Sequence, residues 1–481
     1  MSRRRIAFLL VLGCALSAAP AAQAGAPGRW TQVTSGPKGS LLESVGLART
    51  RDGVLHVAWV RADTPSQDTL LHTAIAPNGA VRAANPIFTW PSISPPALVA
   101  PGGTSLRVLW GAIGQTPGDP VNDLVTDTSD ASGTAWSAPA GVNQSDLAYQ
   151  SPIAATLDRS GQVWSTWDGT FGVRVRPGVA PLGALPPTFL HSGCCFYNSN
   201  VGADARSGEV WAAWDSNVTG DPGRFVQRAG PGGAPTGPRY RAPASATRYG
   251  GAPSYSMPSG RAAIAGRPGG QGRVWTAYPS GYPTTRRIVL WRIEAHRTLT
   301  AANLRAGYAS GTLSLAADQD GRMWTSWVAQ DRRGRLRLFA RRSDRRVSKL
   351  GAIVAVPLPR GTTSAWRAAS SAQNGKLDVL VNLTVGASPN AFTWHTQIRP
   401  PLSLRGVRAR AGRGHVRVTF TATDAGARVP GATVRFRGRR AQTGHDGRAS
   451  FTLARPSRPY RATGVASLGG YGGARATVTV R

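Results

Sequence analysis

The segment 193–200 contains the residue types best suited to binding a ligand. Its candidate ligand-binding residues are Cys194, Cys195, Phe196, Tyr197 and Asn198. Aromatic rings and side-chain amides are typical of pockets that hold small molecules. In an exported protein, which matures in an oxidising compartment, two adjacent thiols can pair as a vicinal disulfide. The segment therefore predicts a ligand site beside a disulfide, and the alternative is a loop that only packs locally.

Four further polar or aromatic residues follow strands that contain Trp or Tyr. They are Asp168, Asp215, Asn217 and Tyr282. If each of these strands is the second strand of a β-hairpin, it ends on the same side of the fold as the loop that leads into the first strand of the hairpin. Loops that converge on one face of a rigid scaffold commonly carry binding residues. We therefore expect these four residues to share one rim with the segment 193–200.

Motifs for catalysis are sparse. The sequence has no G-x-S-x-G elbow, no H-E-x-x-H helix and no P-loop. Its seven histidines lack metal-ligand spacing, so we expect no metal site and no cofactor. None of the three glutamates is placed to assist a catalytic Tyr: Glu209 should lie on a turn and Glu294 in a strand. Glycosidases need two convergent carboxylates, and the aspartates leave such a pair open.

A turn that contains glycine, followed by a short strand ending in an aromatic residue, recurs along the chain. The copies end at Trp59, Trp110, Trp167, Trp214, Tyr278, Trp327 and Val381, about 54 residues apart on average. Each copy fits a β-hairpin, because glycine supplies the φ > 0 of the turn and Trp suits a half-buried strand. Residues 122–139 fit a second hairpin. Each period then holds four strands, which is one blade of a β-propeller.

Seven periods over residues 30–400 predict an all-β chain with a seven-bladed β-propeller, and six blades are the alternative. His56 occupies the Trp position of its copy, so we expect it in the core or at a strand edge. Residues 29–33 resemble the outer strand of a blade but precede the first copy. We expect them to pair with residues 363–398 and to close the ring, because closure removes exposed sheet edges.

Three of the turns resemble the Asp-box, or BNR, turn of sialidase-like propellers. The clearest contains Ser129, Asp130, Gly133, Thr134 and Trp136, with one more residue between Asp and Gly than the family pattern. The others are Asp158-Gly161-Trp164 and Asp318-Gly321-Trp324. The resemblance covers most of residues 30–400. It implies the fold and not the chemistry, because in that family these turns lie far from the active site.

A sialidase would also need three arginines for the substrate carboxylate, a Tyr–Glu nucleophile pair and an acid Asp. No F-R-I-P-like strand follows Trp30, and the nearest matches, at Arg176 and Arg399, are misplaced. The sequence therefore favours a non-catalytic protein that binds a glycan or another extracellular ligand at its rim. A sialidase-like glycoside hydrolase is the alternative.

From residue 401 onward the Trp repeats cease. Residues 416–420, 432–436 and 448–453 alternate between apolar and polar types, which is typical of half-buried strands. Residues 429–434 and 443–451 resemble bacterial Ig-like or carboxypeptidase-regulatory-like modules, which implies a small β-sandwich over residues 401–481. This region contains 16 arginines and two aspartates, a net charge of +14. It is either a module that contacts a polymer or a passive basic stalk.

The N-terminus has the pattern of a signal peptide over residues 1–24. Three arginines precede an apolar stretch, and an A-x-A site predicts cleavage before Gly25. Residues 25–400 would then form the propeller of a secreted or cell-surface protein. A loose lipobox ending at Cys14 leaves lipidation as the alternative. No apolar stretch long enough to span a membrane follows, so no transmembrane span is expected.

The formal net charge of +34 favours anionic partners, such as an acidic glycan or an anionic envelope polymer. The arginines are scattered and no nucleic-acid motif accompanies them, so we expect no specific nucleic-acid partner. The oligomeric state stays open.

The vicinal thiols give a first testable prediction. We expect Cys194 and Cys195 to form a disulfide that stiffens the rim, because no other mature cysteine competes as an intramolecular partner. Such a short ring constrains the unfolded chain little, so replacing both residues with Ser should weaken ligand binding and hardly change the Tm. Intact-mass analysis after alkylation without reductant measures the bridge. Two alkylated thiols in freshly secreted protein would contradict it, and a linked dimer would point to an intermolecular bridge.

Overall fold

The computed structural model describes fourteen segments of the chain. They are residues 28–35, 44–113, 122–145, 152–169, 172–179, 188–189, 196–216, 221–245, 261–268, 273–280, 286–295, 297–304, 311–410 and 414–480. Within these segments the regular elements are β-strands, apart from two short 3-10 turns, η1 (Pro101–Gly103) and η2 (Pro231–Gly233). The described residues include no helix of the length and apolarity that a membrane crossing requires. The prediction of an all-β chain is confirmed.

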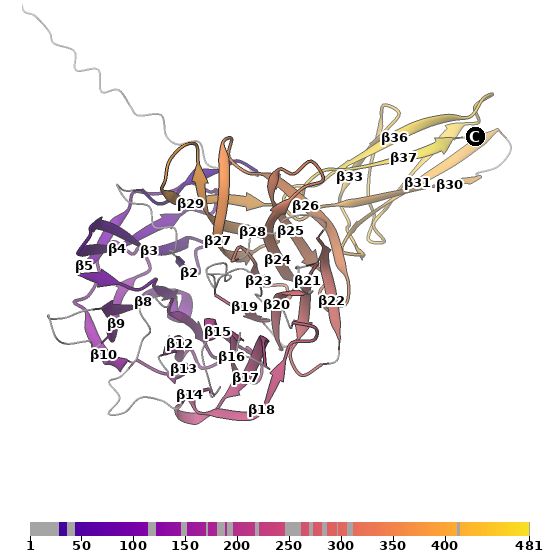
Figure 1. Ribbon diagram of the computed structural model, residues 1–481. Coiled ribbons are helices and arrows are strands. Elements are labelled where there is room, and N and C mark those ends of the chain that lie inside the picture. Colours follow the sequence, from indigo (N-terminus) through magenta and orange to yellow (C-terminus); the bar gives the residue numbers. More distant parts are fainter. Residues whose placement is uncertain are drawn as a thin grey trace, which may run out of the picture.

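Seven antiparallel sheets follow one another along the described part of residues 31–398 and stand in a ring (Figure 1). Sheet 1 consists of β2 (Gly46–Arg49), β3 (Leu55–Thr64), β4 (Gln67–Ile75) and β5 (Asn85–Trp90). Sheet 2 consists of β6 (Ser92–Ile93), β7 (Ala97–Val99), β8 (Ser105–Ile113), β9 (Asn122–Asp130) and β10 (Ala140–Ser145). Sheet 3 consists of β11 (Ala154–Leu157), β12 (Val163–Gly169), β13 (Gly172–Pro177) and β14 (Thr188–Phe189).

The next four sheets continue the ring. Sheet 4 consists of β15 (Phe196–Ala203), β16 (Val210–Ser216), β17 (Gly223–Ala229) and β18 (Pro235–Arg241). Sheet 5 consists of β19 (Ala263–Gly266), β20 (Val274–Ser280), β21 (Arg287–Arg292) and β22 (Thr298–Asn303). Sheet 6 consists of β23 (Ser314–Ala317), β24 (Met323–Gln330), β25 (Leu336–Ser343) and β26 (Leu350–Pro357). Sheet 7 consists of β27 (Thr362–Gln373), β28 (Lys376–Val385), β29 (Ala391–Ile398) and β1 (Thr31–Gln32).

The predicted glycine hairpins join the first and second strands of the sheets. In sheet 3, β11 pairs with β12 around Gly161, whose φ of 84° is easy for glycine and strained for other residues. Asp158 holds this turn, because its carboxylate accepts the backbone N–H of Ser160 at 2.8 Å and the indole N–H of Trp164 at 2.9 Å. The Trp therefore fastens the turn as well as filling the core. Glu294 differs from its prediction, since it lies after β21 in a turn, with φ 65°.

The ring is closed by its two ends, as predicted. β1 pairs with β29, with Thr31 opposite His395 and Gln32 opposite Trp394. The indole N–H of Trp30 also donates to the carbonyl of Pro357 at 2.7 Å. Inside the ring, one inner strand of each sheet contacts the inner strand of the next, in the order β2, β7, β11, β15, β19, β23 and β27, and β27 contacts β2. The edge of the last sheet is thus covered by the start of the chain.

Two further antiparallel sheets make up the C-terminal unit, residues 401–480. Sheet 8 consists of β30 (Ser403–Arg410), β31 (His415–Asp424), β32 (Ala427–Arg428) and β35 (Arg448–Ala454). Sheet 9 consists of β34 (Arg439–Gln442), β33 (Thr433–Phe436), β36 (Tyr460–Ser467) and β37 (Ala474–Val480). Both sheets contribute to one hydrophobic core, in which the rings of Phe420, Phe436 and Phe451 pack against one another. The predicted alternation of apolar and polar residues is confirmed there.

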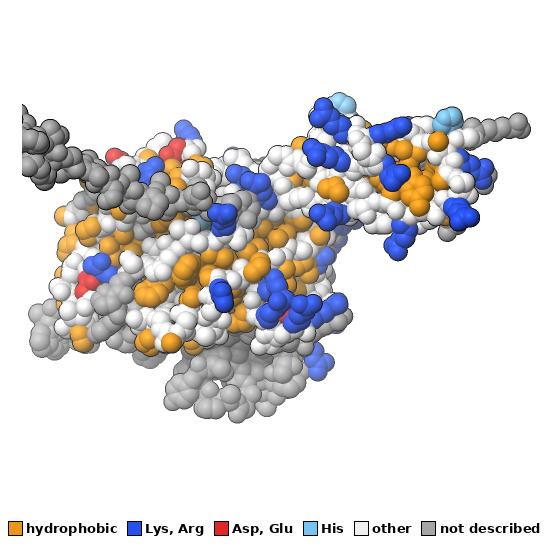
Figure 2. Space-filling model, turned by 90° about the horizontal axis from the view of Figure 1, so that it is seen from above, with side chains coloured by type: hydrophobic (Ala, Val, Ile, Leu, Met, Phe, Trp, Pro, Cys, Tyr) orange, Lys and Arg blue, Asp and Glu red, His pale blue; other side chains and the backbone are white. Residues whose placement is uncertain are grey.

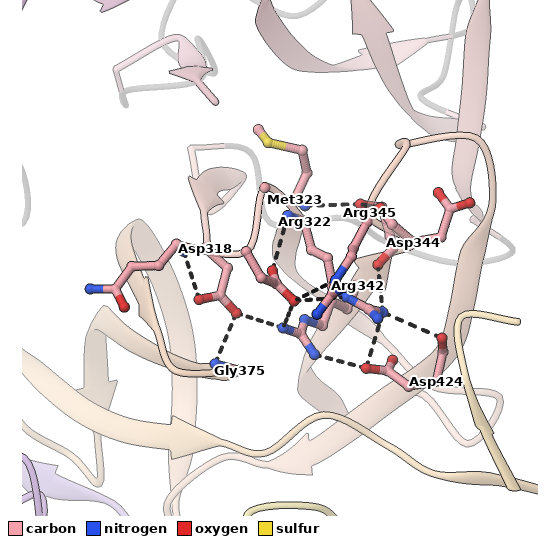
Figure 3. Close-up of polar contacts among 12 residues, drawn as sticks. Asp318, Arg322, Met323, Arg342, Asp344, Arg345, Gly375 and Asp424 are labelled. Atoms are coloured by element: carbon pink, nitrogen blue, oxygen red, sulfur yellow. Dashed lines mark hydrogen bonds and ion pairs between the residues drawn. The ribbon is translucent and has the colours of Figure 1, made fainter. Parts of the chain in front are cut away.

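A buried cluster of ion pairs joins the C-terminal unit to the ring (Figure 3). Arg342 of sheet 6 contacts Asp318 at 2.6 Å and Asp424 of sheet 8 at 2.8 Å. Arg322 contacts the same Asp424 at 3.1 Å. Asp318 belongs to a predicted Asp-box turn, but here its carboxylate binds Arg342 and the backbone N–H of Gly375 instead of an indole. This Asp-box turn thus contributes an ion pair to the contact between sheet 6 and the C-terminal unit.

This joint predicts that Asp424 stabilises the whole chain. Burial raises the pKa of Asp424, and the charges of Arg322 and Arg342 oppose this shift. Replacing Asp424 with Asn removes one member of a buried ion-pair cluster, which typically costs about 3–5 kcal/mol. We expect a loss of about 3 kcal/mol, the low end of this range, because Arg342 keeps its ion pair with Asp318 and Arg322 keeps its ion pair with Asp320. Urea unfolding at pH 7 measures the change.

Asp446→Asn is the matched control for this substitution. Asp446 is exposed in the same unit, and its contact with Arg448 is loose, at 3.9 Å. Exposed ion pairs contribute at most about 1 kcal/mol. Equal effects of the two substitutions would show that the buried cluster does not hold the joint.

Candidate functional site

The inner strands of sheets 1 to 7 (β7 in sheet 2) enclose a central cavity of about 380 Å³. Most of the described residues that line it are small or apolar, mainly Ala, Gly, Leu and Ser. Arg261 and Arg367 supply the charged groups among these lining residues, and no Asp, Glu, His or Tyr is among them. Arg261 precedes β19 and Arg367 lies in the middle of β27, and both contact the residues just before β2, at the end of the cavity that we call the mouth. The described part of the cavity is therefore cationic.

Arg261 reaches across the mouth. It precedes β19 of sheet 5, and its guanidinium donates to the carbonyl of Val45 at 2.8 Å and to that of Pro96 at 2.5 Å. Val45 and Pro96 directly precede β2 and β7, so one side chain bridges sheet 5 to sheets 1 and 2. Its Nε atom is buried and has no hydrogen-bond partner among the described residues.

Arg367 is directed to the mouth by an irregularity in β27. The register with β28 shifts between Ala365 and Ala368, so Trp366 and Arg367 form a bulge opposite Asn382. Bulges commonly redirect a side chain next to functional sites. Arg367 is only 8% exposed, and its guanidinium donates to the hydroxyl of Ser44 at 3.1 Å.

The two guanidinium groups influence each other. Burial, and secondarily the charge of Arg367, lower the pKa of Arg261 to about 9, so this residue stays cationic at neutral pH. Like charges that share a cavity raise the local positive potential and favour an anionic ligand. Carboxylate and sulfate groups match the planar fork of a guanidinium. The charge and geometry of the two side chains at the mouth thus match such a group.

Three of the predicted ligand-binding residues meet in a buried cluster between sheets 3 and 4. Asp215 accepts two hydrogen bonds from Arg224, at 2.6 and 2.9 Å, and one from the side-chain amide of Asn198 at 3.1 Å. Asp168 accepts the backbone N–H of Ser199 at 3.1 Å. None of these carboxylates is among the residues that line the cavity. These hydrogen bonds hold Asn198 and Ser199 of β15 in place. The residue that follows them in the strand, Asn200, does line the cavity.

The other predicted ligand-binding residues lie partly or wholly outside the described structure. Cys194, Cys195, Asn217 and Tyr282 are outside the described residues, so the disulfide and their role stay predictions. Phe196 and Tyr197 begin β15, where their backbones pair with Ser216 and Asp215.

Sequence reasoning missed Arg261 and Arg367. One signal was available for Arg367, because it stands among small residues in the first strand of a repeat, where a charge is unexpected. No comparable local signal marks Arg261, which precedes its strand and contacts residues far away in the sequence.

A pair of buried histidines lies in sheet 1. His56, in the core as expected, contacts His72 at 2.9 Å through ring nitrogens and Thr50 at 3.0 Å. Burial lowers the pKa of both histidines to about 4, so both are neutral at pH 7. The described residues contain no group of three metal-ligating side chains, and we assign the pair a structural role.

No family model matches the chain, and no curated protein matches it. Solved structures with a similar course of the chain include a protein of unknown function from Dyadobacter fermentans, at 11% identity and a TM-score of 0.46, covering 77% of this chain and 97% of that one. A PL25 ulvan lyase bound to -[GlcA(1-4)Rha3S]- is 10% identical with a TM-score of 0.44, covering 76% and 97%. The SapL1 lectin in complex with alpha methyl fucoside is 15% identical with a TM-score of 0.35, covering 81% and 97%. These values are too low to carry a functional argument, which must come from the residues of this chain.

The histidine pair gives a pH prediction. The folded-state pKa of His72, about 4, lies below the ordinary value of 6.5, so the unfolded chain binds more protons between these pH values. This histidine therefore lowers the free energy of unfolding as the pH falls from 6.5 to 4, by up to about 3 kcal/mol at 1.36 kcal/mol per pKa unit.

His72→Gln should flatten the fall in stability between pH 6.5 and 4, measured by urea unfolding at several pH values. His445→Gln, at an exposed residue of the C-terminal unit, should leave the profile unchanged. A His72→Gln profile as steep as that of the wild type would refute the assignment.

Proposed function

We propose that this protein is an exported, non-catalytic binding protein whose cavity mouth binds an anionic group of a glycan. In this proposal residues 25–400 form a seven-bladed, sialidase-like β-propeller, and residues 401–481 form an Ig-like β-sandwich. The seven sheets, the pairing of β1 with β29 and the shared core of sheets 8 and 9 support this architecture. The signal-peptide pattern supports export, which would bring the mouth into contact with extracellular polymers.

The observation that carries the proposal is the pair of arginines at the mouth. Two neighbouring guanidinium groups in a confined cavity repel each other and are partly stripped of water, which costs free energy. A carboxylate or sulfate from a ligand would lower this cost, because such a group matches the planar fork of a guanidinium.

The aspartates support binding over hydrolysis. A glycosidase needs two carboxyl groups that face the scissile bond. Asp215 is instead engaged by Arg224 and Asn198, and Asp168 by the backbone of Ser199. Their hydrogen bonds stabilise β15 beside the cavity.

Titration calorimetry with a short oligogalacturonate tests the proposal. Arg261→Gln should weaken binding at least tenfold, because a hydrogen bond to a charged group contributes about 1.5–3 kcal/mol. Arg332→Gln is the matched control, since it removes the same charge from an exposed turn. The methyl-esterified oligomer, which keeps the sugar rings without the charge, should bind weakly to every variant.

A sulfated neutral oligosaccharide in parallel distinguishes sulfate from carboxylate as the preferred group. Equal binding of the charged and esterified oligomers, or full affinity in Arg261→Gln, would contradict the proposal. Release of new reducing ends from the oligomer would favour the glycoside hydrolase.

A further inference from the structure

The outer face of sheet 9 contains a row of arginines. Directly paired residues of neighbouring strands point to the same face of a sheet. The register places Arg440 opposite Arg435, Arg435 opposite Val465, and Val465 opposite Arg475. All four residues are exposed. We call these four residues the arginine row.

Hydroxyl groups flank the arginine row on the same face. The outward-pointing hydroxyl residues are Thr433, Thr463, Ser467, Thr477 and Thr479. The described strands of sheet 9 present no acidic or aromatic side chain on this face. The two aspartates of the unit lie elsewhere: Asp424 is buried in the joint, and Asp446 lies beside Arg448 outside the sheet. Figure 2 accordingly shows blue side chains spread over this end of the molecule, and no red one on its visible face.

The arginine row is electrostatically unfavourable for the isolated chain. Arg435 and Arg440 stand directly opposite each other, and like charges in this position destabilise a sheet. Neighbouring strands are about 4.8 Å apart, so the backbones of Arg440 and Arg435 are about 5 Å apart and those of Arg435 and Arg475 about 10 Å apart. These spacings match one and two sugar units of an extended polysaccharide chain.

We propose that the arginine row is a second binding site, for an anionic polysaccharide that runs across the strands of sheet 9. Each arginine pairs with a carboxylate of the polymer, and the flanking hydroxyls bind its sugar hydroxyls. The site does not depend on the cavity mouth. If both sites bind one polymer, the second contact becomes intramolecular and strengthens attachment to long chains but not to short ones.

The chemistry of the face favours a polysaccharide over a nucleic acid. Proteins that bind single-stranded nucleic acids stack the bases on aromatic side chains, and this face presents none. Reading a duplex requires an element that enters a groove, whereas the arginine row lies on a sheet surface. Hydroxyl groups beside guanidinium groups suit a ligand that combines acid groups with many hydroxyls.

Retention of the full-length protein on polygalacturonate tests this site. The triple variant Arg435→Ser, Arg440→Ser, Arg475→Ser should bind the long polymer at least tenfold more weakly than the wild type. The matched control, Arg417→Ser, Arg455→Ser, Arg458→Ser, removes the same charge from exposed positions of the same unit outside sheet 9. It should change the affinity less than threefold. Thermal melting of both variants confirms that they fold.

The short oligogalacturonate separates the two sites. The row variant should keep the binding of the short oligomer that Arg261→Gln removes, and Arg261→Gln should keep the binding that the row variant removes. A variant that combines both changes should bind neither the oligomer nor the polymer. Equal losses in the row and control variants would show that only the net charge matters, and unchanged polymer binding in the row variant would refute the site. Tighter binding of DNA than of polygalacturonate through the row would refute a polysaccharide surface.

Discussion

Close approach of backbone to backbone around the central cavity is the constraint on which the rest of this structure depends. A Cβ atom on Gly266 of β19 would lie 1.6 Å from the carbonyl oxygen of Ala203 in β15. One on Gly46 would lie 2.8 Å from the backbone nitrogen of Leu98. Seven strands can converge around so narrow a space only if their side chains are small. The same constraint limits the size of the cavity. It also leaves room for few long side chains, among which are Arg261 and Arg367.

Most of the fold could be predicted because its signals are local. A glycine turn followed by a Trp strand specifies a hairpin wherever it occurs, as Gly161 and Trp164 show. Closure by Trp30 followed from one strand that had no blade of its own. The ion-pair joint could not be predicted, because Arg342 and Asp424 are 82 residues apart and meet only through tertiary packing.

The rim residues named from the sequence and the arginines at the cavity mouth differ in how far the sequence marks their contacts. Asp215 was expected to face a ligand, whereas it binds Arg224, its direct partner in the register of β16 and β17. A hairpin alignment of the sequence would have revealed that pair. Arg261 could not be found in this way, because it contacts Val45 and Pro96, which are 216 and 165 residues away. Arg367 depends on a bulge that the sequence does not mark.

The central claim is that a confined pair of arginines makes the mouth of the cavity a site for an anionic ligand. A crystal structure of the protein with bound oligogalacturonate tests it most directly. The account predicts a uronate carboxylate at the mouth, within hydrogen-bonding distance of the guanidinium of Arg261 and close to Arg367. At saturating ligand, an oligomer bound elsewhere on the ring, with Arg261 still contacting only Val45 and Pro96, would contradict it.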